Sequence, residues 1–471
     1  MEQRESKFNR VLGVADVFAI AFGAMIGWGW VVLAGTWIEK AGTLGAILAF
    51  VFGGIMILFV GLAYAELTSA LPQCGGEQIF SLRALGPNLS YLCTWAIILS
   101  YVGVVAFEAC ALPTVIDYLI PNFKQGYLYT IGGFDVYASW LAVGVVSSII
   151  VTGINYVGIK TTAVLQNAFT IVIIVVGVIL MIGAIFSGDA EKAKPLFDNG
   201  IGGIASVAVM TPFMLMGFDV IPQAAEEIAI PFKKIGRVIL ISIGSAVTWF
   251  ALIIVAVSVL MTKEDILNSN LVTADAMKYA FGNSQIMASV LIIGGMAGII
   301  TSWNSFFMGG SRAIYALAEA KSLPQFLTKI HPKYKTPTTA ILLIGFISTL
   351  APFFGEEMMQ WLTNAGGVGA VLAYMMVSIS FAVLRKKEPD LKRPYKVKRF
   401  KLVATCAIAM SAFMLLLYMP GMPSGLGAPE WIIVGAWSLL GIVFYIYAKR
   451  KFPDFGRVLN IKLEEVEEKE K

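Results

Sequence analysis

Charged residues are scarce in this sequence of 471 residues. They make up 14% of it, whereas a soluble globular chain has about a quarter. Hydrophobic residues make up 58%, an excess that is too large for one soluble core and fits a chain surrounded by lipid. A large soluble helical protein is excluded, because it would leave many apolar runs of about 20 residues unexplained.

Histidine and cysteine are also rare. The single histidine, His331, lies in a polar loop, and the four cysteines are scattered without CxxC spacing. These patterns indicate no disulfide framework, zinc site or histidine-based triad. No Walker motif is present, so ATP does not drive an activity of this chain directly. Because the basic residues stand in short loops between apolar runs, we expect no nucleic-acid partner, and we expect no cofactor and no resident metal.

Long apolar runs are abundant. About 20 apolar residues span a bilayer core, and a lipid-exposed backbone must satisfy its own hydrogen bonds, which favours helices. The runs are too long for the strands of a β-barrel, which alternate over about ten residues. The sequence therefore predicts an all-α membrane protein with about twelve transmembrane helices, over residues 12–36, 43–70, 89–120, 133–154, 163–187, 201–229, 238–262, 284–311, 338–354, 358–384, 402–420 and 430–448.

Lysine and arginine are unevenly distributed over the loops. If the N-terminus is inside, the outer loops hold six of the 35 basic residues, namely Lys40, Lys124, Lys192, Lys194, Lys263 and Lys278. The positive-inside rule then predicts a multi-pass protein of the cell membrane with both termini in the cytoplasm. The N-terminus is too polar for a cleavable signal peptide. We expect a single transmembrane domain over residues 1–471 and assign no function to the charged tail.

Two of the predicted helices, the first and the sixth, are unusual in the residues that interrupt them. The first has Gly23, Gly27 and Gly29, each of which weakens a helix interior by roughly 1 kcal/mol relative to alanine. The sixth has Pro212 and Pro222, and proline removes a backbone donor. Unwound backbone in a membrane is tolerated where it lines a cavity, and paired interruptions indicate a transporter's binding site. The alternative is that the glycines serve close helix packing.

A series of motifs resembles the amino acid–polyamine–organocation (APC) transporter family over nearly the whole chain. The motifs are Gly23-Ala24-Met25-Ile26-Gly27-Trp28-Gly29, Tyr64-Ala65-Glu66-Leu67 with Pro72 and Gly75-Gly76, Gly217-Phe218-Asp219 with Ala225-Glu226-Glu227, Ser311-Arg312 with Leu323-Pro324, and Pro389-Asp390-Leu391-Lys392-Arg393-Pro394. The resemblance implies the leucine-transporter fold, with inverted five-helix repeats at about 11–187 and 201–384, two further helices at about 402–448, and a cytoplasmic tail, 449–471. It also implies a secondary active transporter of amino acids that works by alternating access, through symport or exchange.

The resemblance places the substrate between helices one and six. Its carboxylate would meet backbone amides of residues 27–29, and its amine would meet carbonyls near Ala24 and in residues 213–216. Phe213 resembles an aromatic gate and Phe306 a second one, with core packing or lipid contact as the alternative for both. The predicted substrate-binding residues are Ala24, Met25, Ile26, Gly27, Trp28, Gly29, Phe213, Met216, Gly217 and Phe306.

The chain departs from the family pattern at two places. Family members typically have a small residue where Trp28 stands, so its indole either shrinks the pocket or faces away from it. Some proton-coupled relatives have a lysine in helix five, but residues 168–174 contain none, which argues against that proton mechanism. The coupling ion is left open as proton or sodium. The hydroxyls of Thr301, Ser302 and Ser305 form a candidate sodium site, although such hydroxyls often bond to their own backbone.

Two acidic residues within the predicted helices are candidates for a functional or structural role. Glu108 lies deep in the third one, where a bare carboxylate is costly and must face a partner or a wet cavity. It is a candidate proton carrier or amine partner, or else a structural carboxyl, and helical spacing places it on the face of Tyr101. Asp219 either fixes the unwound segment of helix six or contacts substrate. Near the cytoplasmic helix ends, acids form an inner gate with Arg83, Lys160 or Arg312, or are ordinary interfacial charges; these acids are Glu66, Glu226 and Glu227.

Other functions fit the sequence less well. An amine or polyamine carrier, the main alternative, would need further carboxylates, and Glu108 is the only evident deep one. A channel would show a repeated filter or pore-lining rings, and a membrane enzyme would show clustered titratable groups. We therefore expect an amino acid transporter and not an enzyme. Its partners would be a small-molecule substrate, a coupling ion and the lipid bilayer. Glu77, after Gly75-Gly76, has no explanation at this level.

Overall fold

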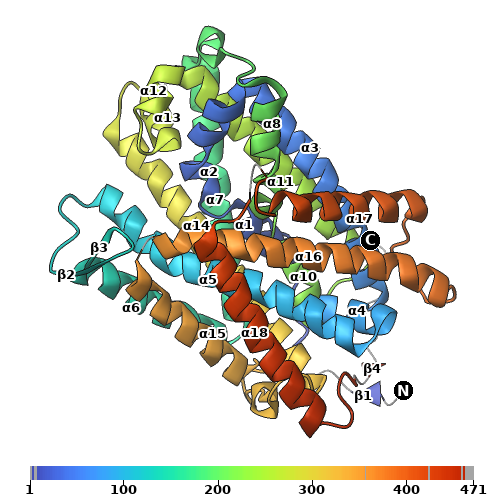
Figure 1. The fold of residues 1–471 in the computed structure, drawn as a ribbon. Coiled ribbons are helices and arrows are strands. Elements are labelled where there is room, and N and C mark those ends of the chain that lie inside the picture. Colours follow the sequence, from blue (N-terminus) through green and yellow to red (C-terminus); the bar gives the residue numbers. More distant parts are fainter. Residues whose placement is uncertain (1–2, 5–7, 356, 423–424, 458–459, 462–471) are drawn as a thin grey trace.

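Helices form almost the whole molecule. The computed structural model describes residues 3–4, 8–355, 357–422, 425–457 and 460–461 (Figure 1). Within these residues, ten helices are long and apolar enough to cross a membrane, and two shorter apolar helices cover 200–214 and 338–354. The prediction of an all-α membrane protein is confirmed, whereas the exact number of crossings and the division into inverted repeats stay predictions. Of the predicted tail, 449–471, residues 458–459 and 462–471 lie outside the described residues.

The helices follow the predicted apolar runs in chain order, with short helices in several loops and at the first and sixth runs. The α-helices are α1 (Val14–Ile26), α2 (Gly29–Val32), α3 (Ala34–Ala70), α4 (Glu77–Leu85), α5 (Pro87–Leu119), α6 (Ala138–Val157), α7 (Ile159–Ser187), α8 (Gly200–Ala208), α9 (Thr211–Met214), α10 (Val220–Gln223), α11 (Phe232–Leu260), α12 (Lys263–Leu267), α13 (Val272–Ala280), α14 (Gln285–Glu319), α15 (Thr338–Leu350), α16 (Glu357–Lys387), α17 (Phe400–Leu417) and α18 (Ala428–Lys451). Four 3-10 turns are η1 (Ala190–Ala193), η2 (Ala225–Glu227), η3 (Gln325–Thr328) and η4 (Ala351–Phe354).

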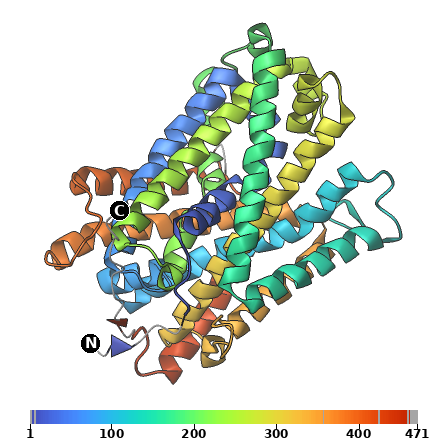
Figure 2. The ribbon, with the colours of Figure 1, turned by 180° about the vertical axis from the view of Figure 1, so that it is seen from behind.

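Burial separates central from peripheral helices. The most apolar window of α5 is 94% buried, whereas that of α18 is 11% buried. The exposed side chains of α18 include Ile432, Leu439 and Val443, which is the pattern of a helix that faces lipid. α1 packs against α7, α11 and α14, and α3 runs beside α11 (Figures 1 and 2). The interrupted first helix is thus surrounded by protein.

Two short segments differ from the apolar-run prediction. The fourth run was predicted to begin at residue 133, but β2 (Tyr127–Ile131) and β3 (Phe134–Tyr137) form an antiparallel hairpin before α6. Gly132 and Gly133, both at positive φ, make its tight turn, as two-residue hairpin loops require. Helix α4 was not predicted, because it is short and too polar for a count of apolar runs.

The two ends of the molecule are distinct. At one end β1 (Gln3–Arg4) pairs with β4 (Asn460–Ile461), so the described segments near the two termini lie together. There the Leu12 amide donates to the Glu227 carbonyl oxygen at 2.9 Å. We call this end the termini end. The β2–β3 hairpin, α12 and α13 lie away from it (Figure 1), and we call that region the hairpin end.

Candidate functional site

The first helical run is interrupted beside the sixth. Helix α1 ends at Ile26, Gly27 has φ 47°, and α2 begins at Gly29. In the sixth run, α9 and α10 are separated by a turn in which Gly217 has φ 137°. A Cβ on Gly217 would lie 2.6 Å from the Cβ of Ala24. Glycine is therefore needed here both for its backbone conformation and for the close crossing of the two segments.

A cavity of about 750 Å³ lies at these interruptions. Nine of the ten predicted substrate-binding residues line it, the exception being Gly217. The cavity reaches the surface at Lys40 and Gly425, which are exposed. Toward the termini end its lining includes Met216 but none of the described residues 217–230. The further lining residues are Val32, Leu33, Val104, Phe107, Glu108, Phe134, Ser206, Val209, Met210, Met214, Ser302, Thr363, Asn364, Tyr418 and Leu426.

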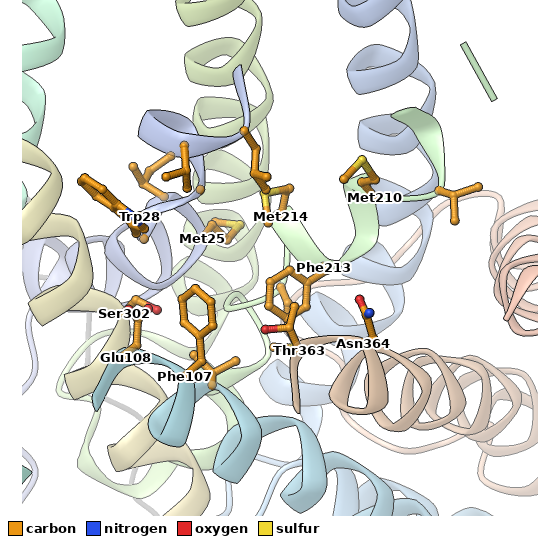
Figure 3. A pocket seen from close by; sticks show the side chains of 18 of the residues that line it. Met25, Trp28, Phe107, Glu108, Met210, Phe213, Met214, Ser302, Thr363 and Asn364 are labelled. Carbon is orange, nitrogen blue, oxygen red and sulfur yellow. The ribbon is translucent and has the colours of Figure 1, made fainter. Parts of the chain in front are cut away.

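Apolar side chains dominate the middle of the cavity. Phe213 and Met214 from α9 face Phe107 of α5 across it, with Met25 of α1 between them (Figure 3). Phe213 is half-buried, as expected of a group at a cavity wall. Phe306 is buried, lines the cavity, and its ring centroid lies 5.8 Å from that of Tyr101. Such walls suit an apolar portion of a ligand.

One carboxyl group lies in this apolar setting. Glu108 is 2% exposed and lies beside Ser302 (Figure 3). A Cβ on Gly27 would be 3.8 Å from Oε1 of Glu108 and 3.6 Å from Oγ of Ser302, so both side chains adjoin the interruption of helix one. In the described part of the chain, Oε2 of Glu108 has no hydrogen-bond partner. A buried carboxyl oxygen without a partner, at a cavity wall, is suited to bind a proton or a ligand's ammonium group.

The indole of Trp28 turns toward α14. A Cβ on Gly295 would lie 2.1 Å from the Cζ3 atom of Trp28, so the ring occupies space that the absent side chain leaves open. Trp28 is 5% exposed and forms part of the cavity wall on the α14 side. The indole therefore packs mainly against α14.

Gly298 likewise leaves space for the backbone at the end of α1. A Cβ there would lie 1.9 Å from the Gly27 carbonyl oxygen. We expect Gly298→Ala to reduce the initial uptake rate by about tenfold or more, because backbone of helix one must shift and a misplaced site loses on the order of 100-fold per ångström. Uptake per folded protein in proteoliposomes measures this. Gly244→Ala in α11 is the control, because its Cβ would meet open space; equal effects of both variants would contradict the close fit.

Asp219 holds the turn of helix six in place. Its Oδ1 accepts hydrogen bonds from the Gly217 amide at 2.8 Å and the Tyr374 hydroxyl at 3.0 Å, and its Oδ2 accepts one from the Tyr101 hydroxyl at 2.7 Å. Asp219 is fully buried and is not one of the cavity-lining residues found in the described chain. This geometry favours the structural interpretation of Asp219 over direct contact with substrate.

The hydroxyls of the candidate sodium site already have partners. Thr301 donates to the Gly23 carbonyl oxygen at 3.0 Å, and Ser305 donates to the Ile20 carbonyl oxygen at 2.9 Å. The side-chain nitrogen of Gln166, from α7, lies among the same groups and donates to Ser305 at 3.0 Å. Of the three predicted hydroxyls, only that of Ser302 lines the cavity.

Gln166 connects three helices. Its Nε2 also contacts the carbonyl oxygens of Ala19, at 3.0 Å, and Thr301, at 3.2 Å. Its Oε1 accepts from Asn304 at 2.9 Å, which in turn accepts from Asn155. These amides were not predicted from the sequence, because they carry no charge and belong to none of the family motifs. The available signal was two amide side chains within apolar runs, Gln166 and Asn304, and a third, Asn155, directly after one.

Two buried ion-pair clusters lie at the termini end. Arg312 and Glu227 form a bidentate pair, with nitrogen–oxygen distances of 3.1 and 3.0 Å and both side chains 2% exposed. Of the pairings weighed from sequence, the structure forms that of Glu227 with Arg312 among the residues it describes. Glu66 pairs instead with Arg385 and Arg393, at 2.6 and 3.1 Å. These contacts join helix six to α14 and α3 to α16 and the loop after it.

A cavity between two interrupted helices, inside a bundle of apolar helices, agrees with what comparison with known proteins finds. A family model described as amino acid permease matches residues 12–445. The chain belongs to the amino acid permease family. This confirms the APC resemblance drawn from the motifs. The permease is a multi-pass membrane transporter and not an enzyme.

Characterised relatives align with the permease over nearly its full length. It is 27% identical over 464 residues to the branched-chain amino acid permease BcaP of Bacillus subtilis, covering 95% of this chain and 94% of that protein. It is 25% identical over 456 residues to the methylthioribose transporter of the same species, covering 95% of each. An aspartate–proton symporter, also from Bacillus subtilis, is 24% identical over 462 residues, covering 95% of this chain and 85% of that protein.

Proposed function

We propose that this permease carries an amino acid with an apolar side chain by alternating access, coupled to a proton. The observation that supports this most directly is the cavity at the interruption of helix one, with apolar walls and the carboxyl group of Glu108. Family membership supports the amino acid, while the side-chain class and the coupling ion follow from the cavity's chemistry.

The backbone at the interruption provides the groups that recognise an amino acid. The carbonyl groups at the end of α1, near Ala24, have no amide N–H donor within the helix, as is the case at every helix C-terminus. Amides of Gly27, Trp28 and Gly29 belong to cavity-lining residues. We propose that these amides bind the substrate carboxylate and that the carbonyls bind its ammonium group, as unwound transporter helices do.

The remaining walls favour an apolar side chain. Met25, Val104, Phe107, Met214 and Phe306 surround the space next to the interruption. Among the described lining residues Glu108 is the only acid and Lys40 the only base, so a polyamine would lack partners for its further ammonium groups. The relative named as a branched-chain amino acid permease agrees with this choice.

A proton is the coupling ion that the site favours. Sodium needs several oxygen ligands, and the hydroxyls of Thr301 and Ser305 are engaged with carbonyls of helix one and with the Gln166 amide. Glu108 has a free carboxyl oxygen at the cavity instead. A relative is named as an aspartate–proton symporter, which agrees with this choice.

The proposed orientation follows from the distribution of basic residues. With both termini in the cytoplasm, the termini end faces inside the cell and the hairpin end faces outside. The cavity, which reaches the surface at Lys40 and Gly425, then opens to the exterior in the state seen here. Labelling of single cysteines introduced at Lys40 and at Lys387, both exposed, would report the side of each.

The experiment that tests the function is uptake of labelled compounds into proteoliposomes under imposed proton or sodium gradients. The panel contains leucine, isoleucine, methionine, alanine, aspartate, lysine and putrescine. We expect saturable uptake of the apolar amino acids, driven by the proton gradient. Uptake of putrescine alone would establish the amine carrier instead, and uptake driven by sodium alone would contradict the proton.

Substitution of a cavity wall should change the selectivity for side-chain size. We expect Phe107→Ala to lower the preference for leucine over alanine by about tenfold, because lost apolar contacts in a pocket are worth about 1–3 kcal/mol. The measurement is the ratio of kcat/KM values for the two substrates. Phe346→Ala is the matched control, because this ring is 62% exposed on α15. An unchanged ratio in Phe107→Ala would remove Phe107 from the side-chain site.

A further inference from the structure

A short segment before α4 is wedged between helix six and α14 at the termini end. The Cys74 amide donates to Oε1 of Glu226 at 3.0 Å. A Cβ on Gly75 would lie 2.3 Å from the Cβ of Ala316, and one on Gly76 would lie 2.7 Å from that of Pro222. The segment 73–77 therefore fills the space between helices that must separate for the cavity to open at this end.

Glu77 ends this segment with a buried carboxyl group. It is 0% exposed, and its Oε2 accepts a hydrogen bond from Nε2 of Gln223, which is also 0% exposed. The Tyr64 hydroxyl lies beside the carboxyl. Within the described part of the chain, Oε1 of Glu77, Oε1 of Gln223 and the Tyr64 hydroxyl have no partner at hydrogen-bonding distance. Two of these three oxygens, those of Glu77 and Gln223, can only accept, and the Tyr64 hydroxyl has one hydrogen to share between them.

The groups that face Glu77 provide no positive charge. From helix six, Asp219 acts on it electrostatically, and Tyr64 of α3 does so as well. The neighbouring groups on α5 are Cys93 and Tyr101, and the one on α16 is Tyr374. Among these described neighbours none is a lysine or an arginine. An ionised Glu77 would thus be a buried charge without a counter-charge, which is strongly unfavourable.

We propose that Glu77 is a proton-binding site and that the bound proton fastens segment 73–77 to helix six while the cavity is closed at the termini end. A protonated carboxyl group gains one O–H donor, which gives the buried oxygens a second donor beside the Tyr64 hydroxyl. The same proton removes the uncompensated charge. Glu77 is thereby separate from Glu108, which lies at the cavity and not at this seal.

Opening at the termini end changes the surroundings of Glu77. Separation of helix six from α14 exposes the carboxyl group to water, where it ionises and releases its proton. Burial, and then the Asp219 carboxyl, raise the pKa of Glu77 above its ordinary value in the closed state. A proton bound more tightly to the closed state favours closure at low pH and opening at high pH on this side. The inference rests on the proposed alternating access, but not on the substrate or on Glu108.

Cys74 provides a reporter that needs no substrate. It is 5% exposed in the closed segment, and a variant with Cys93, Cys110 and Cys406 replaced by serine would leave it as the single thiol. Inside-out vesicles expose the proposed cytoplasmic side to a membrane-impermeant maleimide. In this background we expect the labelling rate to rise between about pH 6 and about pH 8 more steeply than thiol ionisation alone explains.

Glu77→Gln supplies a permanent amide donor and imitates the protonated acid. We expect it to label about tenfold more slowly than the parent near pH 8 and to retain only the pH dependence of the thiol. Glu388→Gln is the matched control, since this carboxyl lies at the same end, is 25% exposed and pairs with Arg83; it should label like the parent. If Glu77→Gln does not fold, Gln223→Met, which removes the partner amide, should label fast even near pH 6.

Three results would overturn the proposal. These are the same pH profile in the parent and in Glu77→Gln, slow labelling of Gln223→Met near pH 6, and protection of Cys74 by sodium at fixed pH, which would indicate a small metal cation at Glu77. Uptake in the same preparation separates the two hypotheses. A pH-dependent Cys74 without amino acid uptake would leave the proton site standing and refute the proposed function, and proton-driven uptake with a pH-independent Cys74 would do the reverse.

Discussion

Arg312→Met is expected to destabilise the folded permease by about 3–5 kcal/mol, the cost of leaving a buried charge without its partner. In a site that is 2% exposed, Glu227 would lose both hydrogen bonds to the guanidinium group and would have to stay ionised without a counter-charge or bind a proton, and either outcome is unfavourable. Part of this energy can be recovered if helix six moves away from α14, so the variant should also favour opening at the termini end. Unfolding in detergent measures the first effect, and Cys74 labelling measures the second.

Arg83→Met is the matched control for this experiment. Arg83 also pairs with an acid at the termini end, at 2.6 Å from Glu388, but the two side chains are 27% and 25% exposed. Exposed pairs contribute about 0–1 kcal/mol, so this variant should unfold nearly like the parent. The double variant Glu227→Leu with Arg312→Met should recover much of the lost stability, because no charge is left buried. Equal losses for Arg83→Met and Arg312→Met would show that burial does not govern these pairs.

Glu108→Gln is expected to abolish proton-driven accumulation while exchange of substrate across the membrane continues. The amide keeps the shape of the side chain at Gly27 and Ser302 but cannot bind and release a proton. With one proton per substrate, a gradient of one pH unit supports about a tenfold accumulation, and the variant should reach only equal concentrations. The measurements are accumulation under an imposed gradient and counterflow without one.

Glu39→Gln is the control for general effects of removing an acid, because Glu39 is exposed on α3 and does not line the cavity in the described chain. It should accumulate substrate like the parent. Accumulation by Glu108→Gln with an unchanged pH profile would show that the proton binds elsewhere. Loss of both accumulation and counterflow would instead assign Glu108 to substrate binding, as an amine partner.

Long-range patterns in the sequence predicted the architecture well, because lipid imposes a simple requirement. A helix that crosses a bilayer needs about 20 apolar residues, and such runs stand out whatever their neighbours are. The glycines at positions 23, 27 and 29 were also informative, because the prolines of the sixth run form a second interruption, and paired interruptions indicate a binding site. The cavity does lie beside them. The resemblance to the family then indicated which residues of helix six, 213–217, lie beside the interruption of helix one.

Features that depend on which helices are neighbours were not predictable in the same way. The orientation of Trp28 depends on Gly295, which lies far along the chain. The partners of Glu66 come from α16 and from the loop that follows it. Helix α4 and the β2–β3 hairpin are short and polar, so no apolar run marks them. The seal around Glu77 depends on Gln223, a polar residue that carries no charge and belongs to no motif identified from the sequence.

The Gln166 amide affects how strongly α1 is held to α14. If a dissolved ion stood where the Gln166 amide stands, its occupancy would depend on its concentration relative to its dissociation constant. A side chain anchored on α7 is always present at the same high effective concentration. Its hydrogen bonds to the Ala19 carbonyl and to Ser305 therefore have a strength that the salinity of the surroundings does not set. We therefore expect these contacts of Gln166 with α1 and α14 to persist at low and at high salt concentration.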